Sequence, residues 1–116
     1  MKHRVLVMNG QRIVQNEQAP GAWHTARVDK AGLLKPGIYN IYAATTVDKS
    51  KAHEGAIVHA DKDVIYQQIG RQFVKHDRTD FDKIPEIGSV KSITYAKTGY
   101  AQVAAASENL GKKLSR

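Results

Sequence analysis

The chain has 116 residues, 41% of them hydrophobic, which fits a single domain with a substantial buried core. Eighteen lysines and arginines against eleven aspartates and glutamates give a net charge of +7, which favours polyanionic partners such as DNA or an acidic protein face. The absence of cysteine excludes disulfides and thiolate metal sites, and no signal peptide or run of ~18 apolar residues is present, so we expect a soluble cytoplasmic protein that avoids membranes.

The first part of the chain is predicted to form a β-hairpin and a third strand. Residues 4–8 and 12–15 are β-rich runs separated by Asn9-Gly10. This dipeptide is the strongest two-residue hairpin signal, because both residues tolerate the positive φ of a type I′ turn. A polar loop at 16–21 is then expected to lead into a strand at 23–28.

The next segment is predicted to contain a helical turn, an aromatic strand and a loop. The turn is expected at 29–34 and the strand at 38–43. Tyr39 and Tyr42 cannot share one face of a regular strand, so the pattern implies a β-bulge or burial on both faces. Residues 45–54 are charged and lack an apolar period, which predicts a mobile loop.

The most informative pattern lies in residues 54–104, where short runs rich in β-branched and aromatic residues alternate with turn signals. Strands are expected at 56–60, 64–69, 72–76, 89–95 and 100–105. Between them, residues 77–84 are predicted to form one short helical turn, with Asp77 as the N-cap and Pro85 as the stop.

This spacing predicts a mainly β fold. We expect a small antiparallel barrel or half-barrel of about seven strands, SH3-like in size, with the N-terminal hairpin packed on it. Residues 1–105 would form one domain with its core barrel at about 54–104. Residues 106–116 are small, polar and basic, and predict a flexible tail.

Signals for catalysis or cofactor binding are weak. The five histidines lack the HxH or HxxxH spacing of metal ligands, although His59 and His76 could meet across neighbouring strands. GxSxG, GxGxxG and P-loop motifs are absent, and the paired aspartates lie in predicted turns. The sequence therefore favours a protein that is not an enzyme and has no cofactor.

One candidate binding surface is the segment QQIGRQ at residues 67–72, which would present a cationic lip on a hairpin. Such a lip suits a phosphate or an acidic side chain, but the simpler interpretation is that Gly70 only supplies turn geometry. Trp23 is expected to be either a core residue or an interface anchor.

The run EGAIVHADKDVIYQQIGRQFVKHDRTDF, followed by IGSVKSITY, resembles the KfrB domain. The residues that carry the pattern are Tyr66, Gln67, Gly70, His76, Asp77, Gly88, Ile93 and Tyr95. The opening RVLVMNGQRIVQ and the later KPGIYNIYAA are also similar to stand-alone KfrB proteins of broad-host-range conjugative plasmids. The pattern includes strands and turns but no catalytic signature.

The resemblance implies a plasmid-encoded accessory protein in plasmid maintenance and stability, acting beside a KfrA-like coiled-coil DNA-binding protein and a KfrC-like protein. We therefore expect an adaptor that binds such partners at an apolar groove or exposed strand edge with a basic rim. The residues predicted to contact a partner are Tyr66, Gln67, Arg71, His76 and Arg78. The alternative is a small basic barrel that binds DNA or RNA directly, and a homodimer is left open.

Overall fold

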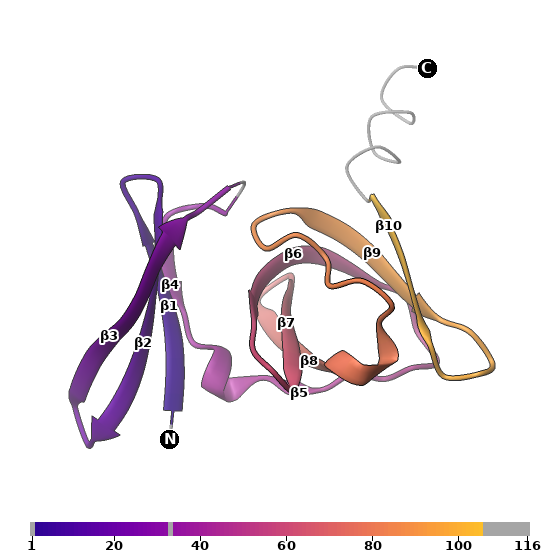
Figure 1. Cartoon of the computed structure of the whole chain (residues 1–116), viewed down its shortest axis with the longest axis horizontal. Coiled ribbons are helices and arrows are strands. Elements are labelled where there is room, and N and C mark those ends of the chain that lie inside the picture. Colours follow the sequence, from indigo (N-terminus) through magenta and orange to yellow (C-terminus); the bar gives the residue numbers. More distant parts are fainter. Residues whose placement is uncertain (1, 33, 106–116) are drawn as a thin grey trace.

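The computed structural model describes residues 2–32 and 34–105, which form two β-sheets lying side by side (Figure 1). The N-terminal sheet has the order β3-β2-β1-β4 and is antiparallel throughout. Its strands are β1 (Lys2–Met8), β2 (Gln11–Ala19), β3 (Ala22–Lys30) and β4 (Gly37–Tyr39). The prediction of a mainly β fold is confirmed.

The C-terminal sheet has six strands in the order β10-β9-β6-β7-β8-β5. They are β5 (Thr45–Thr46), β6 (His53–Ala60), β7 (Val64–Ile69), β8 (Gln72–Asp77), β9 (Val90–Tyr95) and β10 (Ala101–Ala105). This sheet curves strongly (Figure 1), but its edge strands β5 and β10 do not pair with each other. A closed barrel requires its two edge strands to pair, so of the two predicted forms, barrel or half-barrel, the closed barrel is wrong. The N-terminal hairpin is part of a separate four-stranded sheet and does not pack alone on a barrel.

The predicted hairpin turn is confirmed. Asn9 and Gly10 have φ angles of 52° and 74°, the left-handed values that a type I′ turn needs. Strands β2 and β3 are longer than predicted and meet at Pro20-Gly21, so most of the loop expected at 16–21 is strand. The pairing of these strands shifts register twice, which is consistent with the irregular alternation of apolar and polar residues in this segment.

The aromatic segment at 38–43 is not one strand. Strand β4 ends at Tyr39, which is buried, and a three-residue 3-10 turn, η1 (Ile41–Ala43), then turns the exposed Tyr42 away. The sequence implied a β-bulge or burial on both faces, whereas the two tyrosines separate through a change of backbone conformation and Tyr42 is exposed.

The predicted helical turn near 77–84 is shortened to the 3-10 turn η2 (Arg78–Asp80). Asp77 occupies the N-cap position, as predicted, but its side chain makes no capping hydrogen bond. The backbone amide of Arg78 instead donates to the carbonyl oxygen of Asp63 at 3.0 Å, which anchors the segment to the preceding turn. No helix in the described part of the chain is long and apolar enough to cross a membrane.

Two apolar clusters stabilise the described residues. The first joins the two sheets: Val5, Val7 and Val14 of the N-terminal sheet pack with Val58 of β6, with Tyr66 and Phe73 at the margin. The second lies inside the curved sheet and contains Ile57, Ile65, Phe81 and Ile93. The segment after η2 supplies Phe81 and crosses the open side of the curve (Figure 1). The predicted tail at 106–116 lies outside the described residues.

Candidate functional site

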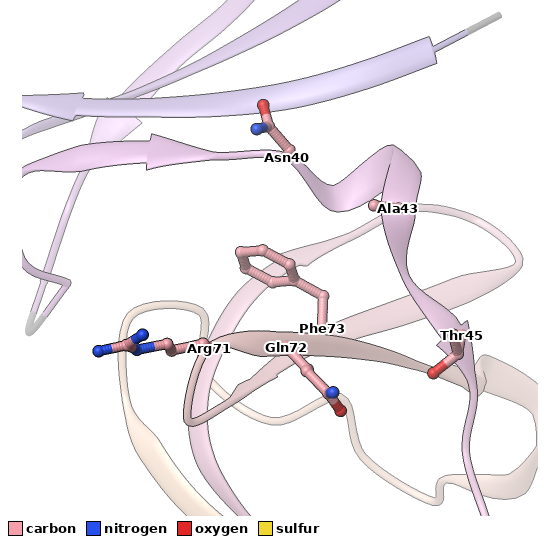
Figure 2. Close-up of a pocket in the computed structure, with 6 residues that line it drawn as sticks. All are labelled: Asn40, Ala43, Thr45, Arg71, Gln72 and Phe73. Atoms are coloured by element: carbon pink, nitrogen blue, oxygen red, sulfur yellow. The ribbon is translucent and has the colours of Figure 1, made fainter.

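A pocket of about 400 Å³ lies between η1 and the turn that joins β7 to β8. The residues that line it are Asn40, Ala43, Thr45, Arg71, Gln72 and Phe73. Figure 2 shows the Phe73 ring pointing toward Asn40 and Ala43, while Arg71 extends to one side and Gln72 points to the opposite side of the strand from Phe73. The pocket therefore has an apolar centre and a polar, cationic rim.

The apolar centre is rigidly supported. Phe73 meets the ring of Tyr39 edge to face, with centroids 6.2 Å apart. The Tyr39 hydroxyl donates to the carbonyl oxygen of Lys35 at 2.5 Å, and burial raises the pKa of this phenol, so it stays protonated. Tyr39 at the end of β4 thus holds the Phe73 ring in place within the pocket wall.

Arg71 reaches the rim because of the turn that precedes it. Gly70 has a φ of 59°, which closes the two-residue connection between β7 and β8 and leaves Arg71 exposed. Of the segment predicted to form a cationic lip, Gly70, Arg71 and Gln72 are exposed, whereas Gln67 is buried. The opposite wall comes from residues 40–45. No local pattern predicts this contact, because it joins segments far apart along the chain.

The other predicted contact residues lie elsewhere. Tyr66 is half-buried and stacks on His59, with ring centroids 6.1 Å apart. Arg78 donates from Nη1 to the carbonyl oxygen of Asp61 at 2.8 Å, which ties its guanidinium to a turn. Neither side chain lines the pocket beside Arg71.

Gln67 and His76 are fully buried, so their side chains do not reach a partner in this structure. The Gln67 amide nitrogen donates to the carbonyl oxygens of His53, Gly55 and Lys91, at 3.2, 3.2 and 3.0 Å. Its amide oxygen must therefore be the acceptor for His76 Nε2, at 2.9 Å. The two N–H groups of the Gln67 amide are thus shared among three backbone carbonyl oxygens inside the curved sheet.

This arrangement also assigns the tautomer of His76. Because Nε2 carries the proton, Nδ1 accepts a hydrogen bond from the Tyr95 hydroxyl at 2.6 Å. Burial, with a smaller contribution from His53, lowers the pKa of His76 to about 4, and burial raises the pKa of Tyr95. At neutral pH the network is uncharged and stabilises the fold.

The sequence contained a signal for this burial. Gln67 lies two positions after Ile65 and two positions before Ile69 along β7. All three side chains therefore share one face of the strand, and Ile65 is fully buried. A polar residue at an inward position indicates an internal hydrogen-bond partner.

The described residues contain no group of three or more histidine, cysteine, aspartate or glutamate side chains that could hold a metal ion. His59 and His76 make separate contacts. His59 Nδ1 accepts a hydrogen bond from buried Arg12 at 3.0 Å, whereas His76 meets His53 edge to face. Burial and the charge of Arg12 lower the pKa of His59 to about 4.

Residues 52–105 match the family model of the KfrB domain. The chain contains a KfrB domain. The match covers strands β6 to β10, and three residues of the family pattern, Gln67, His76 and Tyr95, form the buried network described above. The motif is thus explained by internal hydrogen bonding of the curved sheet.

The chain is also similar to Protein TraB of Escherichia coli, with 35% identity over 98 residues. The matched part is 81% of this chain and 66% of that protein. The similarity therefore extends beyond the KfrB domain into the N-terminal sheet. Together, the two comparisons indicate a plasmid-associated protein.

Proposed function

We propose that this protein is a non-enzymatic adaptor in plasmid maintenance, and that it binds partner proteins at the pocket between η1 and the β7–β8 turn. The observation that carries the proposal is the pairing of an apolar centre, Phe73, with the exposed cation Arg71 at the rim. A pocket with an apolar centre and polar groups around it suits recognition of one anchoring side chain.

The partner would insert an apolar side chain against Phe73 and place a carboxylate beside Arg71. Arginine presents a planar set of donors that matches a carboxylate, which makes this contact directional. The candidate partners are the KfrA-like coiled-coil DNA-binding protein and the KfrC-like protein, which the KfrB similarity suggests. Binding to the KfrA-like protein would connect the chain to plasmid DNA through that partner.

The test is isothermal titration calorimetry of the full chain against each of these two proteins from the same plasmid. Arg71→Glu is expected to weaken binding at least about tenfold, which corresponds to about 1.4 kcal/mol. The matched control is Lys97→Glu, because Lys97 is an exposed cation in the β9–β10 turn, outside the pocket. Absence of binding to both proteins, or equal losses in the two variants, contradicts the proposal.

Direct binding of DNA or RNA is the second candidate function, and the net charge of +7 favours it. Such binding weakens with salt, by about 0.9 log units per tenfold change for each duplex phosphate neutralised. A salt titration against random duplex and single-stranded DNA distinguishes the two functions. No measurable binding at ~50 mM salt removes this candidate.

A further inference from the structure

An apolar row crosses the whole N-terminal sheet on the face opposite its core. The strand registers align Val28 with Ile13, Ile13 with Leu6, and Leu6 with Ile38. The row therefore contains one residue from each of β3, β2, β1 and β4. Such alignment places four branched aliphatic side chains next to one another.

Strand alternation assigns this row to the outer face. Val5, Val7 and Val14 point into the cluster shared with the C-terminal sheet, so their neighbours along β1 and β2 point away from it. Ile38 is 63% exposed and Val28 is 50% exposed, and Met8, on the same side of β1 as Leu6, is 46% exposed. Soluble proteins rarely expose contiguous apolar surface of this kind unless it serves binding.

A cation–aromatic cluster borders the row. The Arg4 guanidinium lies 4.1 Å from the Trp23 ring centroid, and the Lys2 ammonium lies 5.1 Å from that of Tyr42. The Trp23 and Tyr42 rings are themselves 6.3 Å apart. Arg4 is held in place by a hydrogen bond from its Nε to Gln15 at 2.8 Å. The edge strand β3 supplies Trp23, and the turn η1 supplies Tyr42, so the two rings meet on one face.

The charge of this face is positive. Strand alternation places Lys2, Arg4 and Lys30 on the same face as the apolar row. Among the strand residues of this face, Glu17 is the acidic one. Glu17 lies 4.0 Å from the Lys2 ammonium and also accepts a hydrogen bond from the Gly21 amide. An apolar row with cations on both sides complements a partner surface whose apolar side chains are flanked by carboxylates.

We propose that the outer face of the N-terminal sheet docks an acidic amphipathic helix of a partner protein. Neighbouring strands lie about 4.8 Å apart. Successive turns of a helix repeat every ~5.4 Å. A helix lying across the strands therefore places apolar side chains at i, i+4 and i+7 over successive members of the row, while its glutamates meet Lys2, Arg4 and Lys30.

Two other occupants fit the face less well. Single-stranded nucleic acid needs open aromatic faces for stacking, whereas cations already lie over Trp23 and Tyr42, and the row itself is aliphatic. A second copy of this chain would bring the same cations against one another. An acidic helix satisfies both the apolar row and the charge.

This face lies outside residues 52–105 and does not include the pocket around Arg71. It therefore adds a second binding surface to the proposed adaptor, and each surface can fail without the other. Two distinct surfaces would let the chain hold two partners at once.

The test uses the fluorescence of Trp23, the single tryptophan of the chain, which lies within the face. The probe is a synthetic helical peptide with leucines at i, i+4 and i+7 and glutamates on both flanks. A second peptide replaces every glutamate with lysine. The acidic peptide is expected to change Trp23 emission in a saturable manner, with a dissociation constant below ~1 mM, and to bind at least about tenfold more tightly than the basic peptide.

Substitutions locate the binding. Ile38 and Val28 lie on opposite edges of the sheet. Ile38→Asp and Val28→Asp are each expected to weaken binding of the acidic peptide at least about tenfold. Val103→Asp on β10 changes an exposed aliphatic residue of the other sheet, and Arg71→Glu changes the pocket; both should bind as the unsubstituted chain does. Circular dichroism confirms that each variant is folded.

Three outcomes would overturn the inference. The first is no saturable binding of the acidic peptide, or equal affinity for the acidic and basic peptides. The second is an oligothymidine that binds this face more tightly than the acidic peptide and loses affinity in Ile38→Asp. The third is a concentration-dependent dimer, seen by sedimentation, that Ile38→Asp abolishes.

Discussion

The imidazole Nδ1 of His76 lies 2.6 Å from the phenolic oxygen of Tyr95, and this contact connects β8 to β9. The two strands are not neighbours, because β6 and β7 lie between them in the sheet. The curvature of the sheet brings them together across its interior. The hydrogen bond therefore stabilises the curve itself.

Tyr95→Phe should destabilise the fold. The substitution leaves His76 Nδ1 without its donor in a buried site, at a cost of about 1–3 kcal/mol in the free energy of unfolding. Urea denaturation followed by circular dichroism measures this loss. Tyr100→Phe is the matched control, since Tyr100 is 58% exposed. A Tyr95→Phe variant as stable as the control would show that the contact contributes little.

Acid should unfold the protein through His76. Its pKa is about 4 in the folded chain against the ordinary value of 6.5, because burial disfavours the charged ring. Above pH 6.5 neither state binds this proton, so the stability is intact. As the pH falls from 6.5 to 4 only the unfolded chain takes up the proton, and stability is lost, by about 3 kcal/mol at full protonation.

Thermal melting between pH 7.5 and 4 checks this dependence. His76→Gln is expected to lower stability at neutral pH and to flatten the acid-dependent part of the curve. His24→Gln removes an exposed histidine on β3 and should leave the curve unchanged. Parallel curves for His76→Gln and the unsubstituted chain would assign the acid sensitivity to other groups, such as His59.

Gly55→Ala should disrupt the junction of β6 and β7. A Cβ at this position would lie 1.7 Å from the backbone oxygen of Gln68, which cannot move without breaking the ladder. We expect a loss above about 3 kcal/mol or failure to fold. Gly70→Ala is the comparison, because it has open space and a φ of +59°, and should cost only about 1 kcal/mol. Equal costs would contradict the steric argument.

Asp29→Asn should weaken the contact between the two sheets. Asp29 lies 3.0 Å from the guanidinium of Arg12, which is 3% exposed and also reaches the carbonyl oxygen of Val58. Removing the carboxylate leaves a buried cation poorly compensated, at a cost of about 1–3 kcal/mol.

Arg27→Gln is the control for this ion pair, because Arg27 contacts the same carboxylate from an exposed position. Exposed ion pairs contribute about 0–1 kcal/mol, so this variant should be nearly as stable as the unsubstituted chain. Chemical denaturation of both variants gives the comparison. A larger loss in Arg27→Gln than in Asp29→Asn would reverse the assignment.

Local patterns predicted the strands and turns well. Asn9-Gly10 gave the first hairpin, and the turns at 61–63, 70–71 and 97–99 separate the strands of the C-terminal sheet as expected. These features depend on residues within a few positions of one another. The short runs rich in β-branched and aromatic residues also predicted a mainly β protein.

The candidate site was predicted only in part. Arg71 was expected at a hairpin lip and lies there, but Gln67 and His76 were expected at the surface and are buried. Their partners are the carbonyl groups of β6 and β9 and the hydroxyl of Tyr95, which become neighbours only after the sheet curves. The inward position of Gln67 indicates that an internal partner exists, but it does not identify partners so distant along the chain.

The amino-acid sequence alone determined the family, the positive charge and the strand-and-turn pattern, because each depends on composition or on short-range backbone preferences. Only the tertiary structure decided that the sheet stays open, that Phe73 and Arg71 share a pocket with Asn40, and that Trp23 meets Tyr42 on an outer face. Those outcomes depend on which strand edges pair and which sheet faces pack. Such long-range contacts depend on the relative free energies of alternative packings of the whole chain, which short-range preferences do not determine.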